Sequence, residues 1–147
     1  IYDGAGVPVP DALVEIWQAD TAGRVSRAPG SLRRDGATFT GWGRAATDAD
    51  GRYRFTTVVP GAISPGQPPH FAVAVFARGL LGGIFTRAYL PGVHEGSDAL
   101  LRTVDASRRD TLFCVAESNS GSMRYRFDMR LQGPNETVFL AYEDSRG

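Results

Sequence analysis

The 147-residue chain is poor in the features that mark several common protein classes. Its only cysteine, Cys114, cannot form an internal disulfide, which excludes a small secreted scaffold held by disulfides. No run of about 18 apolar residues occurs, so no transmembrane helix is expected. Sixteen basic residues balance sixteen acidic ones, which argues against a protein that binds nucleic acid or a membrane surface through charge. No signal peptide is visible, and we expect a cytoplasmic location.

The sequence also lacks the motifs of common catalytic and metal sites. It has no Cys-x-x-Cys, no His-Glu-x-x-His, no Gly-rich phosphate loop and no Gly-x-Ser-x-Gly. Of its two histidines, His94 lies in a polar turn, and His70 has no further metal-ligand donor at close spacing. From the residues alone we interpret His70 as structural and His94 as a solvated loop residue. Lysine is missing too, so every basic side chain is a planar guanidinium, which suits carboxylates.

What the chain does have is a recurring alternation of apolar and polar residues, which is typical of strands. The alternation predicts strands at residues 11–20, 53–59, 70–78, 84–90, 123–131 and 137–142, with a weaker candidate at 111–116. Hydrophobic residues make up 42% of the chain, a globular composition. We therefore expect an all-β fold, a β-sandwich or barrel, in one domain over residues 1–147.

Between the strands, glycine, proline and acidic residues mark turns and loops. Residues 48–51, Asp-Ala-Asp-Gly, predict a tight turn. One short helix is expected at residues 98–104, with Ser97 as its N-cap. Residues 21–43 have no periodicity and are long for a loop in a compact domain, so we expect them to be functional or packed on a partner.

Arg78 ends the strand that is expected to begin at His70. The two residues share the same strand parity, but at ~3.3 Å per residue their Cα atoms lie about 26 Å apart, too far for one small-molecule site. An arginine at the end of an apolar strand has to find an anion or reach water. Two interpretations follow, pairing with a nearby carboxylate or binding of an anionic ligand.

Segments along nearly the whole chain resemble the intradiol ring-cleavage dioxygenases. The first is Pro-Val-Pro-Asp-Ala-Leu-Val-Glu-Ile-Trp-Gln-Ala-Asp at residues 8–20. The others are Gly-Arg-Ala-Ala-Thr-Asp-Ala-Asp-Gly-Arg-Tyr-Arg-Phe at 43–55, Val-Pro-Gly at 59–61, and the segments 69–79, 85–90, 108–112 and 125–139. The resemblance implies a β-sandwich of the intradiol dioxygenase type, with long loops and at most one short helix, in agreement with the alternation.

Members of that family hold a ferric ion with two tyrosinates and two histidines. The resemblance matches each of these four ligands to one position of this sequence. The first tyrosine follows a Gly-Arg pair, and Val25 stands there; the second lies shortly after a Pro-Gly, where Ile63 is the match. The family's His-x-His pair corresponds to His70 and Ala72. Only one donor of four remains. The resemblance therefore implies vestigial ligand positions, no bound metal and no catalytic residue in this chain.

This loss is similar to the pattern of an iron-free alpha chain in those family members that combine two kinds of chain. The resemblance then implies that Fe(3+) is bound by a partner beta chain, within a higher (alpha-beta)n oligomer. It implies cleavage of protocatechuate with dioxygen to 3-carboxy-cis,cis-muconate. It also implies a substrate-binding role for Arg78, because a forked guanidinium suits the ring carboxylate of protocatechuate.

The resemblance further concerns the start of the chain. Family alpha chains carry a segment ahead of a Tyr-Asp-Gly turn, whereas this sequence starts at Ile1, directly before that turn. We therefore expect the N-terminal segment to be missing. An unpaired sheet edge and poor solubility without the partner are then expected.

Two alternatives stay open at this point. The first is a self-sufficient dioxygenase with rearranged iron ligands, drawn from Tyr53, Tyr89, Tyr125 and the two histidines, although their spacings fit poorly. Stoichiometric iron in the isolated chain would favour it. The second is an Ig-like binding or transport module without an enzymatic role, which the lack of any neighbouring beta-type gene would favour.

Overall fold

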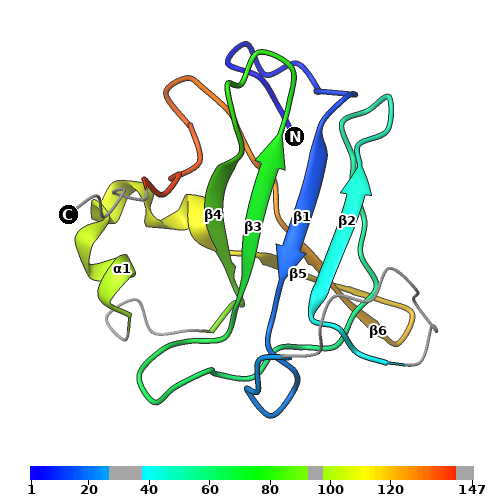
Figure 1. Ribbon diagram of the computed structural model, residues 1–147. Coiled ribbons are helices and arrows are strands. Elements are labelled where there is room, and N and C mark those ends of the chain that lie inside the picture. Colours follow the sequence, from blue (N-terminus) through cyan, green and yellow to red (C-terminus); the bar gives the residue numbers. More distant parts are fainter. Residues whose placement is uncertain (27–37, 93–97, 142–147) are drawn as a thin grey trace.

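The structure, a computed structural model, describes residues 1–26, 38–92 and 98–141. Within these ranges the elements follow the order β1 (Leu13–Trp17), β2 (Trp42–Ala46), β3 (His70–Phe76), β4 (Ile84–Tyr89), α1 (Ala99–Thr103), the 3-10 helix η1 (Ala106–Leu112), β5 (Val115–Asn119) and β6 (Ser122–Arg126). Strands dominate and helices are short, which confirms the all-β expectation (Figure 1). No described helix has the length and apolar character needed to cross a membrane.

Two antiparallel sheets form the fold. The larger has the strand order β2-β1-β3-β4, and β5 pairs with β6 in a hairpin. In the larger sheet Trp17 lies opposite Trp42 on one side and Ala72 on the other, and Ala72 pairs in turn with Arg87. This register places residues from four strands in one row across the sheet.

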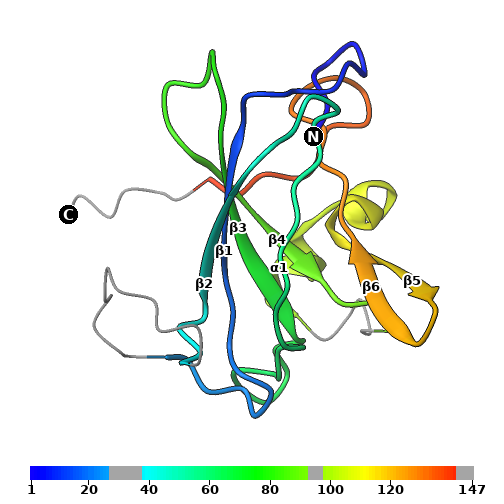
Figure 2. The same ribbon diagram turned by 90° about the vertical axis from the view of Figure 1, so that its right-hand side faces the viewer.

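The core lies on one face of the larger sheet. β1 and β3 contribute Val14, Ile16, Val73 and Val75, all buried. Opposite them pack side chains of β6, of the segment that follows it and of the extended segment between β2 and β3; these are Tyr53, Phe55, Tyr125, Phe127, Met129 and Leu131. Figure 2 shows the larger sheet and the β5–β6 hairpin as two layers. The sandwich expected from the sequence is confirmed.

The other face of the larger sheet points outward and holds polar and aromatic side chains. Trp17 remains 41% exposed there. Glu15 is buried on the same face and accepts hydrogen bonds from both Nε (2.7 Å) and Nη2 of Arg44. This pairing satisfies a buried carboxylate in the middle of the sheet.

Three of the predicted strands are confirmed with shorter bounds, namely β1, β3 and β4. β3 ends at Phe76 because a turn follows, closed by the Leu80 amide donating to the Ala77 carbonyl at 3.1 Å. The predicted turn at residues 48–51 is also confirmed, since the Gly51 amide donates to the Asp48 carbonyl at 2.9 Å.

Two predicted strands are wrong. Residues 53–59 form no strand, because part of this segment is held by a side chain rather than by a neighbouring strand: Gln18 bonds the Val58 carbonyl and the Thr57 hydroxyl. Residues 137–141 make only an isolated bridge between Leu140 and Phe85, and residue 142 lies outside the described residues.

The strand predicted at residues 123–131 is too long, because β6 ends at Arg126. β5 is only five residues long, so the ladder has no partner beyond that point. The chain then pairs with the N-terminal segment, where the Tyr2 amide donates to the Met129 carbonyl at 2.9 Å. Met123 lies next to the hairpin turn and is 60% exposed instead of facing the core.

The helical region also differs from expectation in detail. The expected helix is confirmed as α1, but its N-cap is Asp98, whose carboxylate accepts from the Leu100 amide; Ser97 lies outside the described residues, as does His94. The weak strand candidate at residues 111–116 is not one strand, because residues 111–112 end η1 and only residues 115–116 belong to β5. β2 begins at Trp42, within the stretch expected to be a loop.

Candidate functional site

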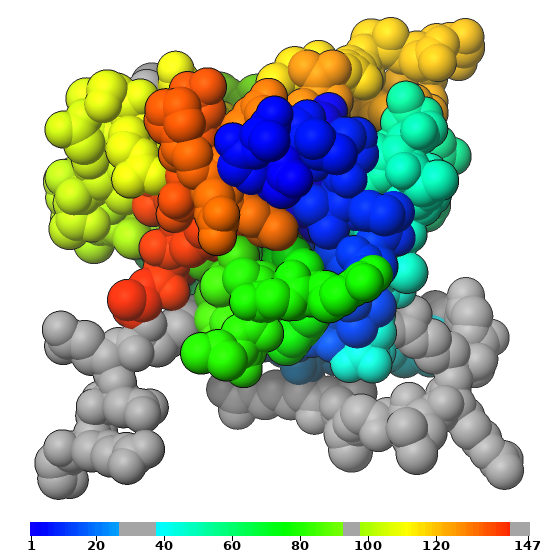
Figure 3. Space-filling model, turned by 90° about the horizontal axis from the view of Figure 1, so that it is seen from above, coloured from blue at the N-terminus to red at the C-terminus, as the bar shows by residue number. Residues whose placement is uncertain are grey.

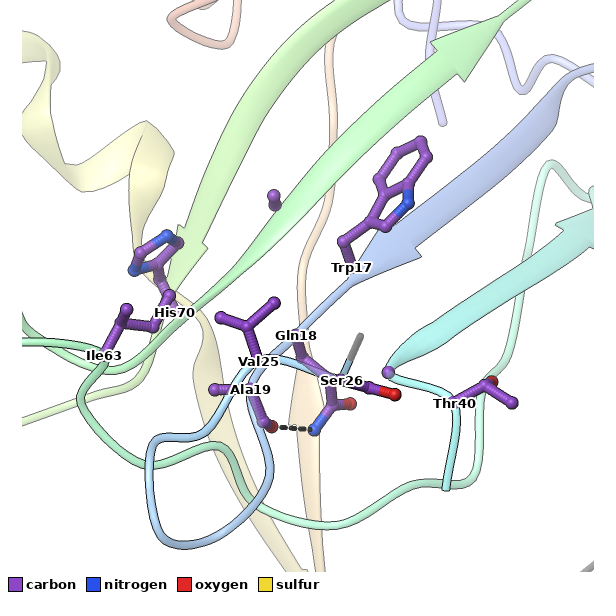
Figure 4. Close-up of a pocket in the computed structure, with 10 residues that line it drawn as sticks. Trp17, Gln18, Ala19, Val25, Ser26, Thr40, Ile63 and His70 are labelled. Atoms are coloured by element: carbon purple, nitrogen blue, oxygen red, sulfur yellow. Dashed lines mark hydrogen bonds between the residues drawn. The ribbon is translucent and has the colours of Figure 1, made fainter. Parts of the chain in front are cut away.

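Val25, Ile63, His70 and Ala72 line a single cavity of about 160 Å³. These are the four positions that the sequence resemblance matches to iron ligands. The cavity opens at the end of the outward sheet face where β1 finishes and β3 begins (Figure 4). Val25 comes from the loop after β1 and Ile63 from the loop before β3. His70 and Ala72 share a face because side chains alternate along a strand.

The two loops meet through a pair of glycines. A Cβ on Gly23 would lie 1.9 Å from the Ala62 carbonyl oxygen, and a Cβ on Gly61 would lie 2.6 Å from the Gly23 nitrogen. Gly23 also has φ +80, a left-handed conformation that disfavours other residues. Glycine at both positions therefore allows the close approach that places Val25 beside Ile63.

Asp20 orders the turn that leads to Val25. Its Oδ1 accepts hydrogen bonds from the backbone amides of Ala22 and Arg24, both at 2.9 Å. These bonds, that from Arg24 above all, lower the pKa of the Asp20 carboxyl. The Asp20 carbonyl accepts from the Gly61 amide at 2.8 Å, so one residue ties both loops together.

Gln18 closes the inner side of the cavity. Its Nε2 donates to the carbonyls of Val58 (2.8 Å) and Ala19 (3.1 Å), and its Oε1 accepts from the Thr57 hydroxyl at 2.6 Å. The side chain is buried with its polar atoms bonded. The side chain is therefore held in one position, and the hydrogen bonds of its amide are made within the protein.

His70 is the one ring nitrogen donor among the four matched positions. Its Nδ1 lies 2.9 Å from the Pro68 carbonyl oxygen, which can only accept, so Nδ1 carries the proton and Nε2 the lone pair. Burial lowers the pKa of His70, and the nearby charge of Arg87 lowers it further. The imidazole is therefore neutral at pH 7. Its ring packs against Tyr89 at a centroid distance of 5.5 Å.

A buried polar network lies behind His70. Tyr89 donates its hydroxyl to Asp98, and Arg87 Nη1 reaches the same carboxylate oxygen at 3.2 Å. Burial, followed by the bond to Asp98, raises the pKa of Tyr89 to about 12. Because Asp98 also caps α1, this network joins the helix to the sheet and fixes the ring on which His70 packs.

The residues around this cavity do not fit the ferric ion of the family. Fe(III) prefers hard oxygen donors such as phenolate, together with imidazole. Val25, Ile63 and Ala72 offer only hydrocarbon, which leaves His70 as one donor of four at the matched positions. Elsewhere in the described ranges, no three His, Cys, Asp or Glu side chains gather closely enough to hold a metal ion.

The tyrosines considered as rearranged iron ligands make other contacts in the fold. Tyr53 donates its hydroxyl to the Phe127 carbonyl at 2.7 Å, and burial raises its pKa. Tyr89 is bonded to Asp98, as described above. Tyr125 packs against the core from β6, in the other layer of the sandwich. A raised pKa disfavours the phenolate that iron would need.

Arg78 lies at the opposite end of the sheet from the cavity. It follows β3 and is 86% exposed, while His70 begins the same strand. Its Nε and Nη2 both donate to Oδ2 of Asp11, the former at 2.6 Å. The carboxylate interpretation of the sequence therefore describes its contact within this chain. Figure 3 shows this end, where the N-terminal residues and the segment after β3 lie together.

Sequence reasoning missed several residues of the site. Trp17 and Gln18 were read only as alternating strand residues, and Thr40 lay in the unassigned loop. The alternation of side chains between the two sheet faces could have indicated Trp17, because the β1–β3 register places it beside Ala72. Arg87 could have been found in the same way, opposite Ala72 on β4. No local signal marks Gln18, whose bonds to Thr57 and Val58 join residues about 40 positions apart.

Comparison with known proteins places this geometry in a family. A profile of the dioxygenase family Dioxygenase_C matches residues 1–133. The chain is 40% identical to a protocatechuate 3,4-dioxygenase alpha chain from Burkholderia cepacia, over 95% of this chain and 73% of that one. It is 34% identical to a protocatechuate 3,4-dioxygenase beta chain from the same species, over 93% of this chain and 63% of that one.

A solved structure agrees with this assignment. The dioxygenase domain of a dioxygenase and carbohydrate-binding protein fusion from Streptomyces sp. SirexAA-E superposes with a TM-score of 0.66 and 29% identity, covering 90% of this chain and 75% of that one. Family profile, sequence identity and fold lead to the same conclusion. The chain belongs to the dioxygenase family Dioxygenase_C, that of the intradiol dioxygenases.

Proposed function

We propose that this chain is the alpha-type, iron-free subunit of a protocatechuate 3,4-dioxygenase. The assembly cleaves protocatechuate with dioxygen to 3-carboxy-cis,cis-muconate, and the ferric ion for this chemistry is bound by a beta chain. The observation that carries the proposal is the cavity in which the four matched positions meet but three carry only hydrocarbon. The 40% identity to an alpha chain supports the same role.

In this proposal Arg78 is the residue that this chain contributes to the substrate pocket of its partner. The exposed guanidinium at the end of β3 can reach beyond its own chain. Its planar fork of donors suits the ring carboxylate of protocatechuate. Asp11 holds the side chain in place through one carboxylate oxygen, so a second anion can share the remaining donors.

The partner in this proposal is a protocatechuate 3,4-dioxygenase beta chain, and alpha-beta pairs associate further into an (alpha-beta)n oligomer in the cytoplasm. The existence of curated relatives named alpha and beta chains supports the first part. Co-expression of this chain with its neighbouring beta-type chain, followed by separation and metal analysis of each chain, tests the proposal. We expect iron in the beta chain and ring cleavage only in the assembly. Stoichiometric ferric iron in this chain would overturn it.

Substitution of Arg78 by alanine in the assembled enzyme tests the pocket assignment. A charge-assisted hydrogen bond of roughly 1.5–3 kcal/mol corresponds to about a 10- to 150-fold loss of affinity for protocatechuate. The iron content should not change. Arg52→Ala serves as a matched control, since Arg52 is another exposed arginine paired with an aspartate. Unaltered kinetics in Arg78→Ala would show that the assignment is wrong.

A further inference from the structure

The cavity lined by Val25, Ile63, His70 and Ala72 has the size of one aromatic ring. Its volume is about 160 Å³. An apolar protein cavity of about 150 Å³ accepts benzene. A single six-membered ring with a small substituent therefore fits.

The rim of the cavity leaves apolar side chains in contact with water. Trp17 is 41% exposed, Val25 56% and Ile63 45%. All three line the cavity, and Ala72 forms part of its floor on β3. A ring bound among them would remove this apolar surface from water, which is the main source of affinity for a small uncharged ligand.

The polar groups of the cavity set the charge of the ligand. No charged side chain is among the described residues that line it. Arg87 lies on the neighbouring strand opposite Ala72, but its guanidinium is paired with Asp98. Asp98 already balances the charge of Arg87, which is not among the described lining residues, so a carboxylate would lose its water shell with little attraction in return, and such desolvation is costly.

His70 offers a fixed acceptor that can orient an uncharged ring, beside the hydroxyls of Ser26 and Thr40. Gln18 is bonded within the protein, and Thr40 Oγ1 donates to the Trp42 carbonyl at 3.3 Å. The His70 ring lines the cavity with Nδ1 committed to Pro68, so Nε2 is the nitrogen with a lone pair to share. A hydroxyl on the ring is the donor that matches it.

We propose that this cavity binds one neutral phenol, with its ring against Trp17, Val25 and Ile63 and its hydroxyl donating to Nε2 of His70. The site is separate from the carboxylate-binding role proposed for Arg78 and selects against carboxylates. The inference concerns this cavity alone and does not depend on the proposed function.

Fluorine NMR titrations of 4-fluorophenol, 4-fluorotoluene and 4-fluorobenzoate test the proposal on the purified protein, together with any partner chain that it retains. We expect 4-fluorophenol to bind more tightly than 4-fluorotoluene by roughly two- to tenfold, the value of one hydrogen bond. That advantage should vanish in His70→Leu. Binding of 4-fluorobenzoate as tight as that of the phenol would overturn the proposal.

Cavity-filling variants localise the binding. Ala72→Phe and, on the exposed rim, Ile63→Phe should abolish phenol binding, whereas Leu81→Phe adds the same ring at a fully exposed position and should leave it unchanged. Because the substitutions lie in this chain, a loss of binding reports on its cavity even beside a partner. Undiminished binding in a folded Ile63→Phe protein would refute the proposal. A loss of partner association instead of phenol binding would identify the cavity as a subunit contact and would also refute it.

Discussion

Replacement of Gly23 by alanine tests whether the close contact between two loops holds the cavity together. Gly23 has φ +80, where a side chain costs about 1–2 kcal/mol. The added Cβ would lie 1.9 Å from the Ala62 oxygen, so the loops would have to separate by about 1.5 Å to reach ordinary contact. That movement breaks the 2.8 Å hydrogen bond from Gly61 to Asp20, for about 1 kcal/mol more. We expect a total loss of about 2–3 kcal/mol of unfolding free energy.

Gly79→Ala is the matched control for this prediction. Gly79 has φ +88, but a Cβ there would meet nothing within 4 Å. The variant carries the conformational cost without the clash, partly offset by the lower entropy of its unfolded chain, so we expect a loss of about 1 kcal/mol. Urea unfolding followed by circular dichroism measures both variants. Equal losses in the two proteins would refute the idea that loop contact, rather than backbone conformation, makes Gly23 necessary.

Three further predictions concern buried polar groups. Arg44→Met leaves the buried Glu15 carboxylate without its two hydrogen bonds and should lower the free energy of unfolding by about 1–2 kcal/mol. The double variant with Glu15→Gln should recover most of this stability. Full stability of the single variant would contradict the prediction. Burial raises the pKa of the Cys114 thiol to about 12, so iodoacetamide should label the unfolded protein much faster than the native one; equal rates would argue against burial. His70 has a folded-state pKa below its ordinary 6.5, so the unfolded chain binds more protons and stability should fall as the pH drops below about 6.5; His70→Leu should lose this slope in urea titrations.

The central strands could be predicted from sequence because their two faces differ in burial or are both apolar. β1, β3 and β4 follow the alternation closely. The sequence does not predict β2 because Trp-Gly-Arg-Ala-Ala has no β-branched residue and contains glycine and alanine, which are weak strand formers; its strand conformation depends on pairing with β1. Residues 53–59 alternate as a strand would, yet Gln18 takes up part of their hydrogen bonding, a tertiary effect that periodicity cannot reveal.

The candidate site was partly predictable. Motif resemblance identified four positions, and the structure places them around one cavity. What holds them there was invisible, because the contact of Gly23 with Ala62 and the bonds of Gln18 join residues distant in sequence. For Arg78 the sequence predicts a carboxylate partner but does not identify it, since Asp11 and Arg78 are 67 positions apart.

The glycine contact and the Asp20 turn have a consequence for how such a pocket can change its role. Many metal centres are ordered by the ion itself, and their ligands scatter when it is removed. Here backbone hydrogen bonds such as that from Gly61 to Asp20 maintain the arrangement. A framework built in this way tolerates exchange of the side chains that point into it. Exchange of these side chains alone could therefore add or remove a metal site here without rebuilding the backbone.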